Sequence, residues 1–472
     1  MHASNPSNPN QKQTGTGKSL IIRAMMNKVQ TSLGHDSILV LAPTGIAALN
    51  IDGFTIHSKL HINTSKEFTD LNNLAARKFC TDMKNVRFIV IDEYSMVGCK
   101  MLGMIDRRLK QATGNYAENF GGLCVFFFGD IRQLPPVLDL PVYSNVTSHD
   151  LLKMHGKFVW DSITCSVILT EVFRQNDEHF KKVLKNISIG EATEEDYELL
   201  KTRFKTNVTV NEREKFKDAI KLFPLRIQVA NENMTYLRRL RSSINNEPLP
   251  IAIIPAQNNC LEAEMEPVEK AGNLAATLFL APTCKIILSS NLWTSQGLVS
   301  GSIGKVVDMI YEKDKSPPVD RPAVLICQFD NYKGPYLDDE LKLVPIPIVT
   351  KSWNTEEGKL CARSQFPVSV ACAITVHRAQ GLTLLKAIID IGSDKDKPPG
   401  LTFVALSRAK SIDGVVLEPF SLERFLKVNK SSILDSKKNF LQKLNIVYNQ
   451  LEAAKTEFLP SIMQTVSIPF EA

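Results

Sequence analysis

The sequence predicts an α/β protein with two lobes, each built on a parallel β-sheet, and a small β-barrel inserted in the second lobe. Helical patterns alternate with short, uniformly apolar runs of the kind that a parallel sheet buries on both faces. In the first lobe the apolar runs are residues 37–42, 88–91 and 123–128. In the second they begin near residue 166 and recur at 222–223, 371–375 and 387–391. Helices between such runs indicate a doubly wound sheet in each lobe.

The pattern changes between the two halves of the second lobe. Short β-type runs separated by Gly, Pro and Asn turns predict the inserted barrel, with the charged stretch 312–322 as a hairpin tip. After residue 420, apolar residues at heptad-like spacing predict a helical tail. The expected domains are residues 1–165 for the first lobe, 166–283 and 366–418 for the second, 284–365 for the barrel and 419–472 for the tail.

Composition narrows the class of protein without identifying its partner. The 56 Lys and Arg against 50 Asp and Glu give a net charge of +6, which permits nucleic-acid binding. The nine cysteines form no CxxC pair and lie largely in apolar runs, so we expect reduced, buried thiols in an intracellular compartment. No apolar stretch approaches the roughly 20 residues of a membrane span. Residues 1–11 lack the apolar core of a signal peptide and contain no Arg.

A glycine-rich turn at the start of the chain predicts a phosphate-binding loop. It is made of Gly15, Thr16, Gly17, Lys18 and Ser19. Such a turn points backbone N–H groups at phosphates, and the following helix adds its positive N-terminal end. Lys18 is expected to neutralise the β- and γ-phosphates of ATP, and the Ser19 hydroxyl to ligate Mg²⁺.

Polar residues follow two buried runs at the point where each strand should end. Asp92 and Glu93 come directly after the run 88–91, where one carboxylate can hold Mg²⁺ and the other can activate the attacking water. Gln133 follows the run 123–128 and a Gly-Asp turn, and its amide is expected to contact the γ-phosphate or that water. The two prolines after Leu134 should hold Gln133 rigidly.

Two arginines of the second lobe complete the predicted catalytic set. Arg174 and Arg408 could contact a γ-phosphate only if the two lobes closed on a shared nucleotide. This arrangement would make hydrolysis depend on closure, as an arginine finger does.

In its motifs the chain resembles the PIF-type DNA helicases, which are relatives of the bacterial RecD helicases in superfamily 1. The matching segments are residues 42–49, 52–58, 91–97, 120–122, 129–137, 173–175, 374–384 and 403–408. The likeness runs from about residue 15 to about residue 417. It implies two RecA-like P-loop lobes and an SH3-like barrel.

The resemblance also implies roles that spacing alone does not assign. It implies that Thr44, Gly45, Thr55 and His57 of the first lobe, and Thr375 and His377 of the second, contact single-stranded DNA. Gln380 and Gly381 are implied to meet the nucleotide and to link DNA to ATP. Hydroxyl, imidazole and backbone N–H groups suit phosphate and sugar contacts, which position a strand without reading its sequence.

The resemblance departs from the family at the beginning of the chain. Family members carry a glutamine-containing segment that grips adenine and a β-strand that enters the phosphate loop, and neither is visible before Lys12. We therefore expect a first lobe that is incomplete at its N-terminus.

The sequence predicts an ATP- and Mg²⁺-dependent DNA helicase moving 5′ to 3′ on single strands. The expected partners are single-stranded DNA and duplex or fork junctions, the expected roles are DNA repair, recombination or telomere maintenance, and the expected location is the nucleus or mitochondrion. We expect a monomer with no membrane partner. One alternative is a truncated or decayed copy that binds nucleic acid without full ATP turnover. Another, a P-loop kinase or GTPase, would not need the second-lobe segments 375–384 and 404–409.

Overall fold

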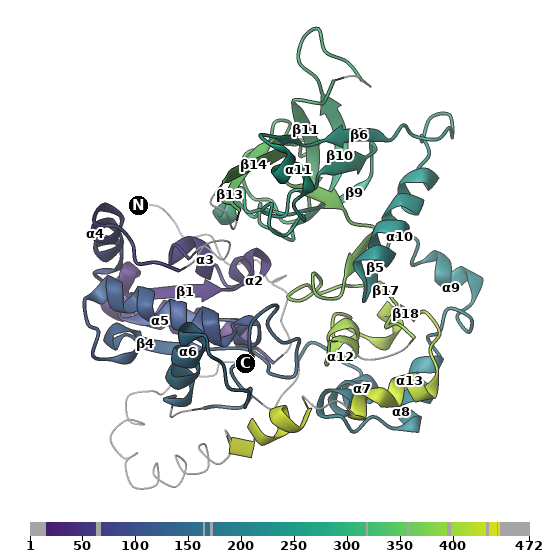
Figure 1. Cartoon of the computed structure of the whole chain (residues 1–472). Helices are drawn as coiled ribbons and strands as arrows, with labels where there is room; N and C mark the ends of the chain where they lie inside the picture. Colours follow the sequence, from purple (N-terminus) through teal and green to yellow (C-terminus); the bar gives the residue numbers. More distant parts are fainter. Residues whose placement is uncertain are drawn as a thin grey trace.

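A computed structural model of the chain describes nine stretches of the sequence. They are residues 16–62, 68–163, 166–169, 173–317, 320–355, 359–393, 398–430, 434–440 and 442–443. The predicted Gly15, the segment before it and the tail beyond residue 443 lie outside them. Figure 1 shows two lobes side by side and a β-rich insert above them.

Lobe 1 is built on a four-stranded parallel sheet with the order β2-β1-β3-β4. Its strands are β1 (Ile38–Ala42), β2 (Phe54–Thr55), β3 (Phe88–Ile91) and β4 (Cys124–Phe127). Its helices are α1 (Lys18–Leu33), α2 (Gly45–Asn50), α3 (Ile56–Lys59), α4 (Asn73–Met83), α5 (Cys99–Thr113) and α6 (Leu151–Asp161). The three apolar runs predicted in this lobe are therefore confirmed as β1, β3 and β4.

Strand alternation gives the lobe 1 sheet two buried faces. Val40 and Ala42 of β1 pack with Ile22 of α1, whereas Leu39 and Leu41 face the cluster that contains α4, α5 and α6. Successive strand residues point to opposite faces, so a run that is covered on both sides must be apolar throughout. Full burial of each such side chain contributes about 1.5–3 kcal/mol. This burial fixes the strand ends that carry the polar loops.

Lobe 2 repeats the plan with the parallel order β16-β5-β17-β18. Its strands are β5 (Ile220–Phe223), β16 (Ala373–Thr375), β17 (Ala387–Ile389) and β18 (Val415–Leu417). Its helices are α7 (Glu178–Ile189), α8 (Glu194–Lys201), α9 (Val210–Glu214), α10 (Arg226–Arg239), α12 (Leu401–Leu406) and α13 (Leu422–Leu426). One expectation was wrong, because residues 166–169 form no strand.

The insert contains antiparallel sheets with the orders β12-β11-β10-β9-β15, β13-β14-β7 and β6-β8. Its elements are β6 (Ala252–Pro255), β7 (Gln257–Asn258), α11 (Leu261–Met265), β8 (Thr277–Leu280), β9 (Lys285–Leu288), β10 (Ile303–Ile310), β11 (Val324–Phe329), β12 (Val344–Pro347), β13 (Val349–Asn354), β14 (Leu360–Gln365) and β15 (Val368–Val370). Strand pairing therefore extends beyond the predicted 284–365, because β7 pairs with β14 and β15 with β9. The SH3-like character of the insert stays a prediction.

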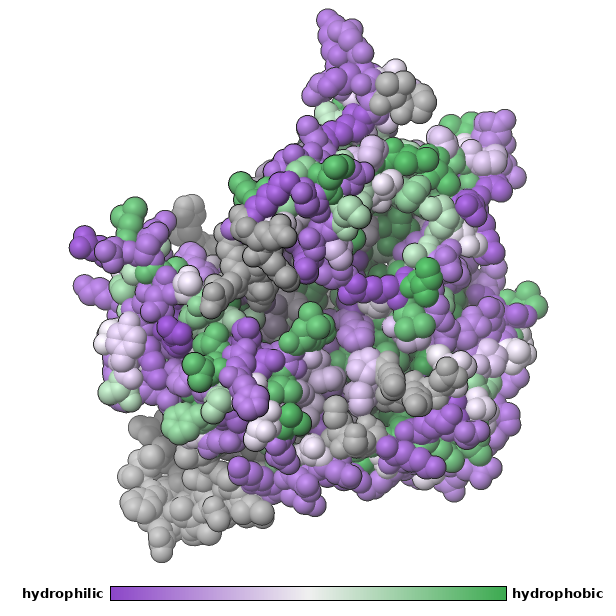
Figure 2. All heavy atoms as spheres, viewed as in Figure 1, coloured by the Kyte–Doolittle hydropathy of each residue, from purple (hydrophilic) through white to green (hydrophobic). Residues whose placement is uncertain are grey.

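Two smaller expectations have clear outcomes. The hairpin tip predicted at 312–322 lies between the paired strands β10 and β11, and its described residues 312–317 and 320–322 lie in the projection at the top of Figure 1, which is largely hydrophilic in Figure 2. The eight described cysteines are free, and five of them are buried as predicted, whereas Cys80 and Cys260 are half-buried and Cys124 at the start of β4 is exposed. Within the described residues, no helix is both long and apolar enough to cross a membrane.

Candidate functional site

The predicted phosphate loop leads directly into α1. Gly17 has a φ of 81°, a left-handed conformation that glycine adopts without steric cost. The first turn of α1 contains no acidic residue, and no described side chain caps it. A first turn without negative charge favours an anion at this end of the helix. Thr16, Lys18 and Ser19 are all half-buried on this turn.

Asp92 and Glu93 follow β3 and form an acidic pair, of which Asp92 is buried and Glu93 is half-buried. Asp92 is 5% exposed, and burial together with the charge of Glu93 raises the pKa of Asp92 to about 7, although Lys18 opposes this rise. Glu93 has a φ of 51°, a strained value for a residue with a side chain. Among the described residues, the buried Glu93 Oε2 has no hydrogen-bond partner. A buried carboxylate oxygen without a partner is expected where a ligand binds.

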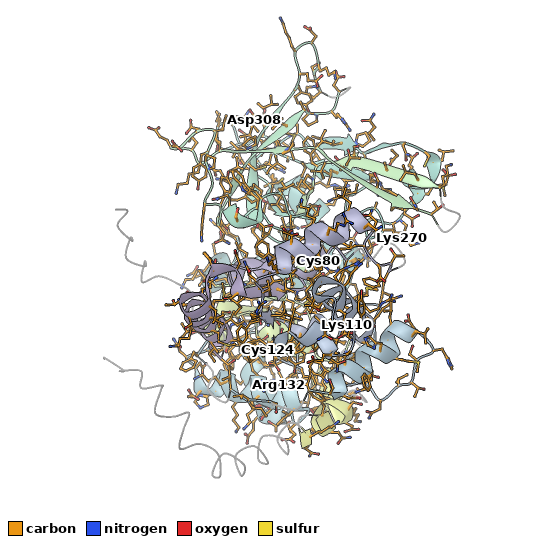
Figure 3. The ribbon with its side chains drawn as sticks, turned by 90° about the vertical axis from the view of Figure 1, so that its left-hand side faces the viewer. Cys80, Lys110, Cys124, Arg132, Lys270 and Asp308 are labelled. Atoms are coloured by element: carbon orange, nitrogen blue, oxygen red, sulfur yellow. The ribbon has the colours of Figure 1, made fainter. Side chains whose placement is uncertain are left out.

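A tight turn after β4 places Gln133. Arg132 donates through Nε and Nη2 to the Asp130 carboxylate at 2.8 and 3.2 Å, and the Gln133 N–H donates to the Asp130 carbonyl at 3.0 Å. Burial raises the pKa of Asp130, but the Arg132 guanidinium and its hydrogen bonds outweigh burial and hold it below its usual value. This turn lies away from the insert. In Figure 3, Arg132 is in the lower half, whereas Lys270 and Asp308 of the insert are in the upper half.

Arg174 of lobe 2 faces the acidic pair of lobe 1. Its Nη1 donates to the Ser407 carbonyl at 3.2 Å, while its buried Nε has no partner among the described residues. Burial lowers the pKa of Arg174, and the charge of Glu93 partly opposes the change. The charge of Glu93 therefore acts on Arg174 across the boundary between the lobes. Phe173 also approaches the phosphate loop, since a Cβ on Gly17 would lie 4.0 Å from its ring.

Arg408 is more deeply buried and is hydrogen-bonded within its own lobe. Its guanidinium donates to the Val404 carbonyl at 2.9 Å and to Ser407 Oγ at 2.8 Å. Burial and the nearby charge of Arg174 lower the pKa of Arg408 to about 9, so that it stays charged at neutral pH, while Glu93 and Asp130 oppose the change. The acids of lobe 1 therefore act on Arg408 across the boundary between the lobes, and its catalytic role stays a prediction.

A direct contact joins the two lobes at Gln133. Gln380 Nε2 donates to Gln133 Oε1 at 3.3 Å, and both side chains are 7% exposed. Next to this contact, Asn50 Nδ2 of α2 donates to the Gly381 carbonyl at 3.4 Å. Gln380 and Gly381 of lobe 2, which are predicted to link DNA to ATP, therefore contact both the Gln133 loop and α2 of lobe 1.

The first-lobe residues implied to contact DNA follow β1 and β2. Thr44 and Thr55 cap α2 and α3, because their hydroxyls accept from Ala47 N at 3.3 Å and from Ser58 N at 3.4 Å. Thr55 is 7% exposed, so capping is its observed role. His57 is half-buried, and burial lowers its pKa.

Gly45 packs directly against the insert. A Cβ on Gly45 would lie 2.4 Å from Asn291 Oδ1 and 3.2 Å from Ser300 N. Only a residue without a side chain permits this approach. The insert is therefore attached to the predicted DNA-contacting loop of lobe 1 as well as to lobe 2.

Thr375 and His377 stand at the end of β16 in lobe 2. Thr375 Oγ1 accepts a hydrogen bond from the Arg378 N–H at 3.4 Å and remains half-buried. Burial and the charge of Arg226 lower the pKa of His377, so its imidazole is neutral at pH 7. Like the first-lobe set, these residues follow the carboxyl end of a parallel strand, where α/β sheets bind ligands.

The residues present fit a magnesium ion that is bound together with phosphate. Asp92 supplies a carboxylate and Ser19 a hydroxyl, which are the hard oxygen ligands that Mg²⁺ prefers. Among the described residues, no three His, Cys, Asp or Glu side chains cluster as a metal site. Mg²⁺ typically keeps waters and takes only one or two protein carboxylates alongside substrate phosphates.

Comparison with known proteins shows a similarity to helicases. Residues 11–198 match the model of the PIF1-like helicases. The ATP-dependent DNA helicase PIF1 of Emericella nidulans is 28% identical over 459 residues, covering 85% of this chain and 56% of that protein. Over these residues the chain is similar to the PIF1-like helicases. The chain spans about half the length of the curated relatives that it matches.

Solved structures of this family share the fold. The Pif1 helicase of Candida albicans has a TM-score of 0.66 at 23% identity, covering 91% of this chain and 94% of that one. A Bacteroides Pif1 in complex with ADP-AlF3 and single-stranded DNA has a TM-score of 0.63 at 23% identity, covering 88% of both chains. These likenesses confirm the α/β architecture with two RecA-like lobes.

Several residues of the site were not singled out from the sequence. Asp130 and Arg132 form the turn that holds Gln133, and Lys437 donates to the Gln133 carbonyl. Asn50 donates to the Gly381 carbonyl, and Asn291 lies against Gly45. Only the neighbours Asp130 and Arg132 carry a local signal, since opposite charges two residues apart in a turn can pair. The others lie far along the chain from their partners.

Proposed function

We propose that this protein is an ATP-dependent DNA helicase that couples Mg²⁺-dependent ATP hydrolysis to 5′-to-3′ movement on single-stranded DNA. The relatives named ATP-dependent DNA helicase support the activity, and the Bacteroides complex with ADP-AlF3 and single-stranded DNA supports both ligands. The observation that carries the proposal is the interface itself. Acidic groups of lobe 1 lie opposite guanidinium groups of lobe 2, and Gln133 meets Gln380 across it.

Each group of the interface has a task in hydrolysis. Lys18 and the α1 N-terminus bind the phosphates, while Ser19 and Asp92 would hold Mg²⁺, which would neutralise phosphate charge. Glu93 Oε2, which has no partner among the described residues, accepts the proton of the attacking water. Arg174 stabilises the charge that develops on the transferred phosphoryl group, and Arg408 adds positive charge from behind it.

The same geometry couples DNA to ATP. Thr44, Gly45 and His57 of lobe 1 and Thr375 and His377 of lobe 2 would hold the strand, with Thr55 ordering the α3 turn beneath His57. Gln380 contacts Gln133, and the neighbouring Gly381 contacts α2 of lobe 1. A shift of lobe 2 along the DNA strand would therefore change the contact at Gln133. The DNA is held through phosphate and sugar, which suits movement over any sequence.

We place the protein on forked or single-stranded DNA in the nucleus or mitochondrion, acting as a monomer in repair, recombination or telomere maintenance. Light scattering with and without a forked substrate tests the oligomeric state.

The deciding experiment measures ATPase activity with and without single-stranded DNA. We expect at least tenfold stimulation by DNA in the presence of Mg²⁺, and unwinding only of duplexes with a 5′ single-stranded tail. Lys18→Ala should remove hydrolysis while DNA binding persists. Strand binding without stimulated hydrolysis in the wild-type protein would instead identify a binding protein that does not turn over ATP.

A further inference from the structure

The helical segment 434–440 bridges the two lobes. In Figure 1 it is the yellow helix near the bottom, between α6 of lobe 1 and α7 of lobe 2. The ring of Phe440 stacks on Trp160 of α6 with centroids 5.9 Å apart and an interplanar angle of 28°. At the other end, Leu434 packs beside Gly190, and Lys438 pairs with Glu191 at 3.6 Å. The segment is therefore fastened to lobe 1 by an aromatic contact and to lobe 2 by apolar and ionic contacts.

Between these anchors, Lys437 extends into the lobe interface. It is 3% exposed, and its Nζ donates to the main-chain carbonyls of Gln133 at 3.0 Å and Arg132 at 3.4 Å. The same ammonium lies 5.9 Å from the centre of the Tyr143 ring. Hydrogen bonds from a charged donor are stronger than neutral ones, and they gain further where water is excluded. The main chain at Gln133 is thus held by a residue 304 positions away.

The surroundings of Lys437 leave little freedom for the carbonyls that it holds. Gly400, just before α12 of lobe 2, lies so close that a Cβ there would be 3.0 Å from the Arg132 carbonyl oxygen and 3.6 Å from Lys437 Nζ. On the other side of the turn, the Gln133 N–H is bonded to Asp130. The main chain of Gln133 is fixed from both sides, and its side chain is thereby directed at Gln380.

We propose that Lys437 is a positioning residue for the hydrolytic step: by holding the Arg132 and Gln133 carbonyls, it keeps the Gln133 amide aligned with Gln380 when the lobes meet. This inference rests on the proposed function. A polar group that must meet a reacting water gains rate from being held in place beforehand, and small displacements lose it. The C-terminal segment is in this way part of the link between lobe position and ATP hydrolysis.

The test compares two adjacent lysines in the full chain. Lys437→Met removes the buried donor but keeps the length of the side chain, and Lys438→Met removes only the ion pair with Glu191. We expect Lys437→Met to lower the kcat of DNA-stimulated ATP hydrolysis about tenfold, with the KM for ATP within about twofold of wild type. Lys437→Arg should recover most of kcat, and Lys438→Met should match wild type. An unchanged kcat in Lys437→Met, or an equal loss in Lys438→Met, would overturn the proposal.

A second measurement is independent of turnover. Hydrogen exchange should be faster at the amides of residues 131–134 in Lys437→Met than in wild type, and unchanged in α5. If Lys437→Met does not fold, Phe440→Leu takes its place, because it loosens the segment without removing the ammonium. Faster exchange at 131–134 supports the positioning role, and unchanged exchange there refutes it. A wild-type protein without DNA-stimulated ATPase activity would refute the proposed function, while exchange would still decide whether Lys437 holds this loop.

Discussion

The two lobes share a parallel-sheet plan but satisfy their buried charges differently. In lobe 1, Asp92 and Glu93 lie side by side, burial and mutual repulsion raise the pKa of Asp92 to about 7, and Glu93 Oε2 has no partner among the described residues. In lobe 2, Arg408 is hydrogen-bonded to Val404 and Ser407 of its own lobe. In lobe 1 the repulsion between the two carboxylates is unfavourable, and a bound cation can relieve it. In lobe 2 the hydrogen bonds within the lobe already satisfy the Arg408 guanidinium.

Arg174 is the exception within lobe 2, and it shows how the two lobes complement each other. Its Nη1 is bound to Ser407, but its buried Nε lacks a partner among the described residues. Of the two arginines, Arg174 therefore has a donor to offer to phosphate, whereas Arg408 mainly holds the segment beside it. Arg174 has a donor without a partner among the described residues, whereas the hydrogen bonds of Arg408 also hold its own segment, and this difference leads to separate predictions.

The largest expected effect concerns these arginines. Arg174→Ala should lower the kcat of DNA-stimulated ATP hydrolysis by about 10²–10³-fold with little change in the melting temperature, because its free donor is used in the transition state. Arg408→Ala should instead destabilise the protein by about 3 kcal/mol, because it leaves buried acceptors unpaired. Steady-state kinetics and thermal denaturation of both variants check this. A folded Arg408→Ala that retains its melting temperature would contradict the assignment.

The acidic side of the comparison predicts an unusual pH dependence in the absence of nucleotide and Mg²⁺. Because the folded-state pKa of Asp92 lies above its unfolded value, the folded state binds the extra proton between about pH 4 and pH 7. The contribution of Asp92 to stability is therefore fully present below pH 4 and is lost as the pH rises to 7. Asp92→Asn should stabilise the protein by about 3 kcal/mol at pH 8 and by almost nothing at pH 4.

Thermal denaturation of wild type and Asp92→Asn across this pH range provides the measurement. Glu118→Gln, a change at an exposed carboxylate of the same lobe, is the matched control and should leave the curve unchanged. Equal melting temperatures for Asp92→Asn and wild type at pH 8 would show that folding does not raise the pKa of Asp92 in the free protein.

The smallest expected effect lies where the lobes touch. Gln380→Ala should reduce the stimulation of ATP hydrolysis by DNA about fivefold to tenfold, because one hydrogen bond between neutral groups contributes about 1 kcal/mol. Hydrolysis without DNA should change less than twofold. The ratio of the two rates is the measurement, and an equal fall in both would show that Gln380 serves catalysis rather than coupling.

Local pattern was enough to predict much of this fold. The apolar runs that became β1, β3, β16 and β17 could be recognised because burial on both faces favours an apolar residue at every position, whereas β4 and β5 are only partly buried. Residues 166–169 are also largely apolar but form no strand, since a strand needs a pairing partner that the sequence does not display. The limits of the insert were drawn too narrowly for a similar reason. The partners β7 and β14 are about 100 residues apart, and short strands carry little periodicity.

The candidate site likewise contains residues that the sequence predicts and contacts that only the structure shows. Lys18, Asp92, Glu93 and Gln133 follow from the sequence because each stands beside a strand or helix whose end is fixed by its apolar run. Thr44 and Thr55 were expected at DNA, and the structure shows that their hydroxyls also cap helices. Their proposed contacts with DNA stay predictions.

The sequence by itself determined which chemical groups this protein carries and at which strand ends they stand, because local hydrophobic burial sets those positions. Only the tertiary structure decided which groups meet. Gln380 contacts Gln133, Gly45 approaches Asn291, and Lys437 holds the Gln133 loop. These contacts join residues 246 or more positions apart. Such contacts depend on how two lobes and a terminal segment pack, and that packing leaves no periodic trace in the chain.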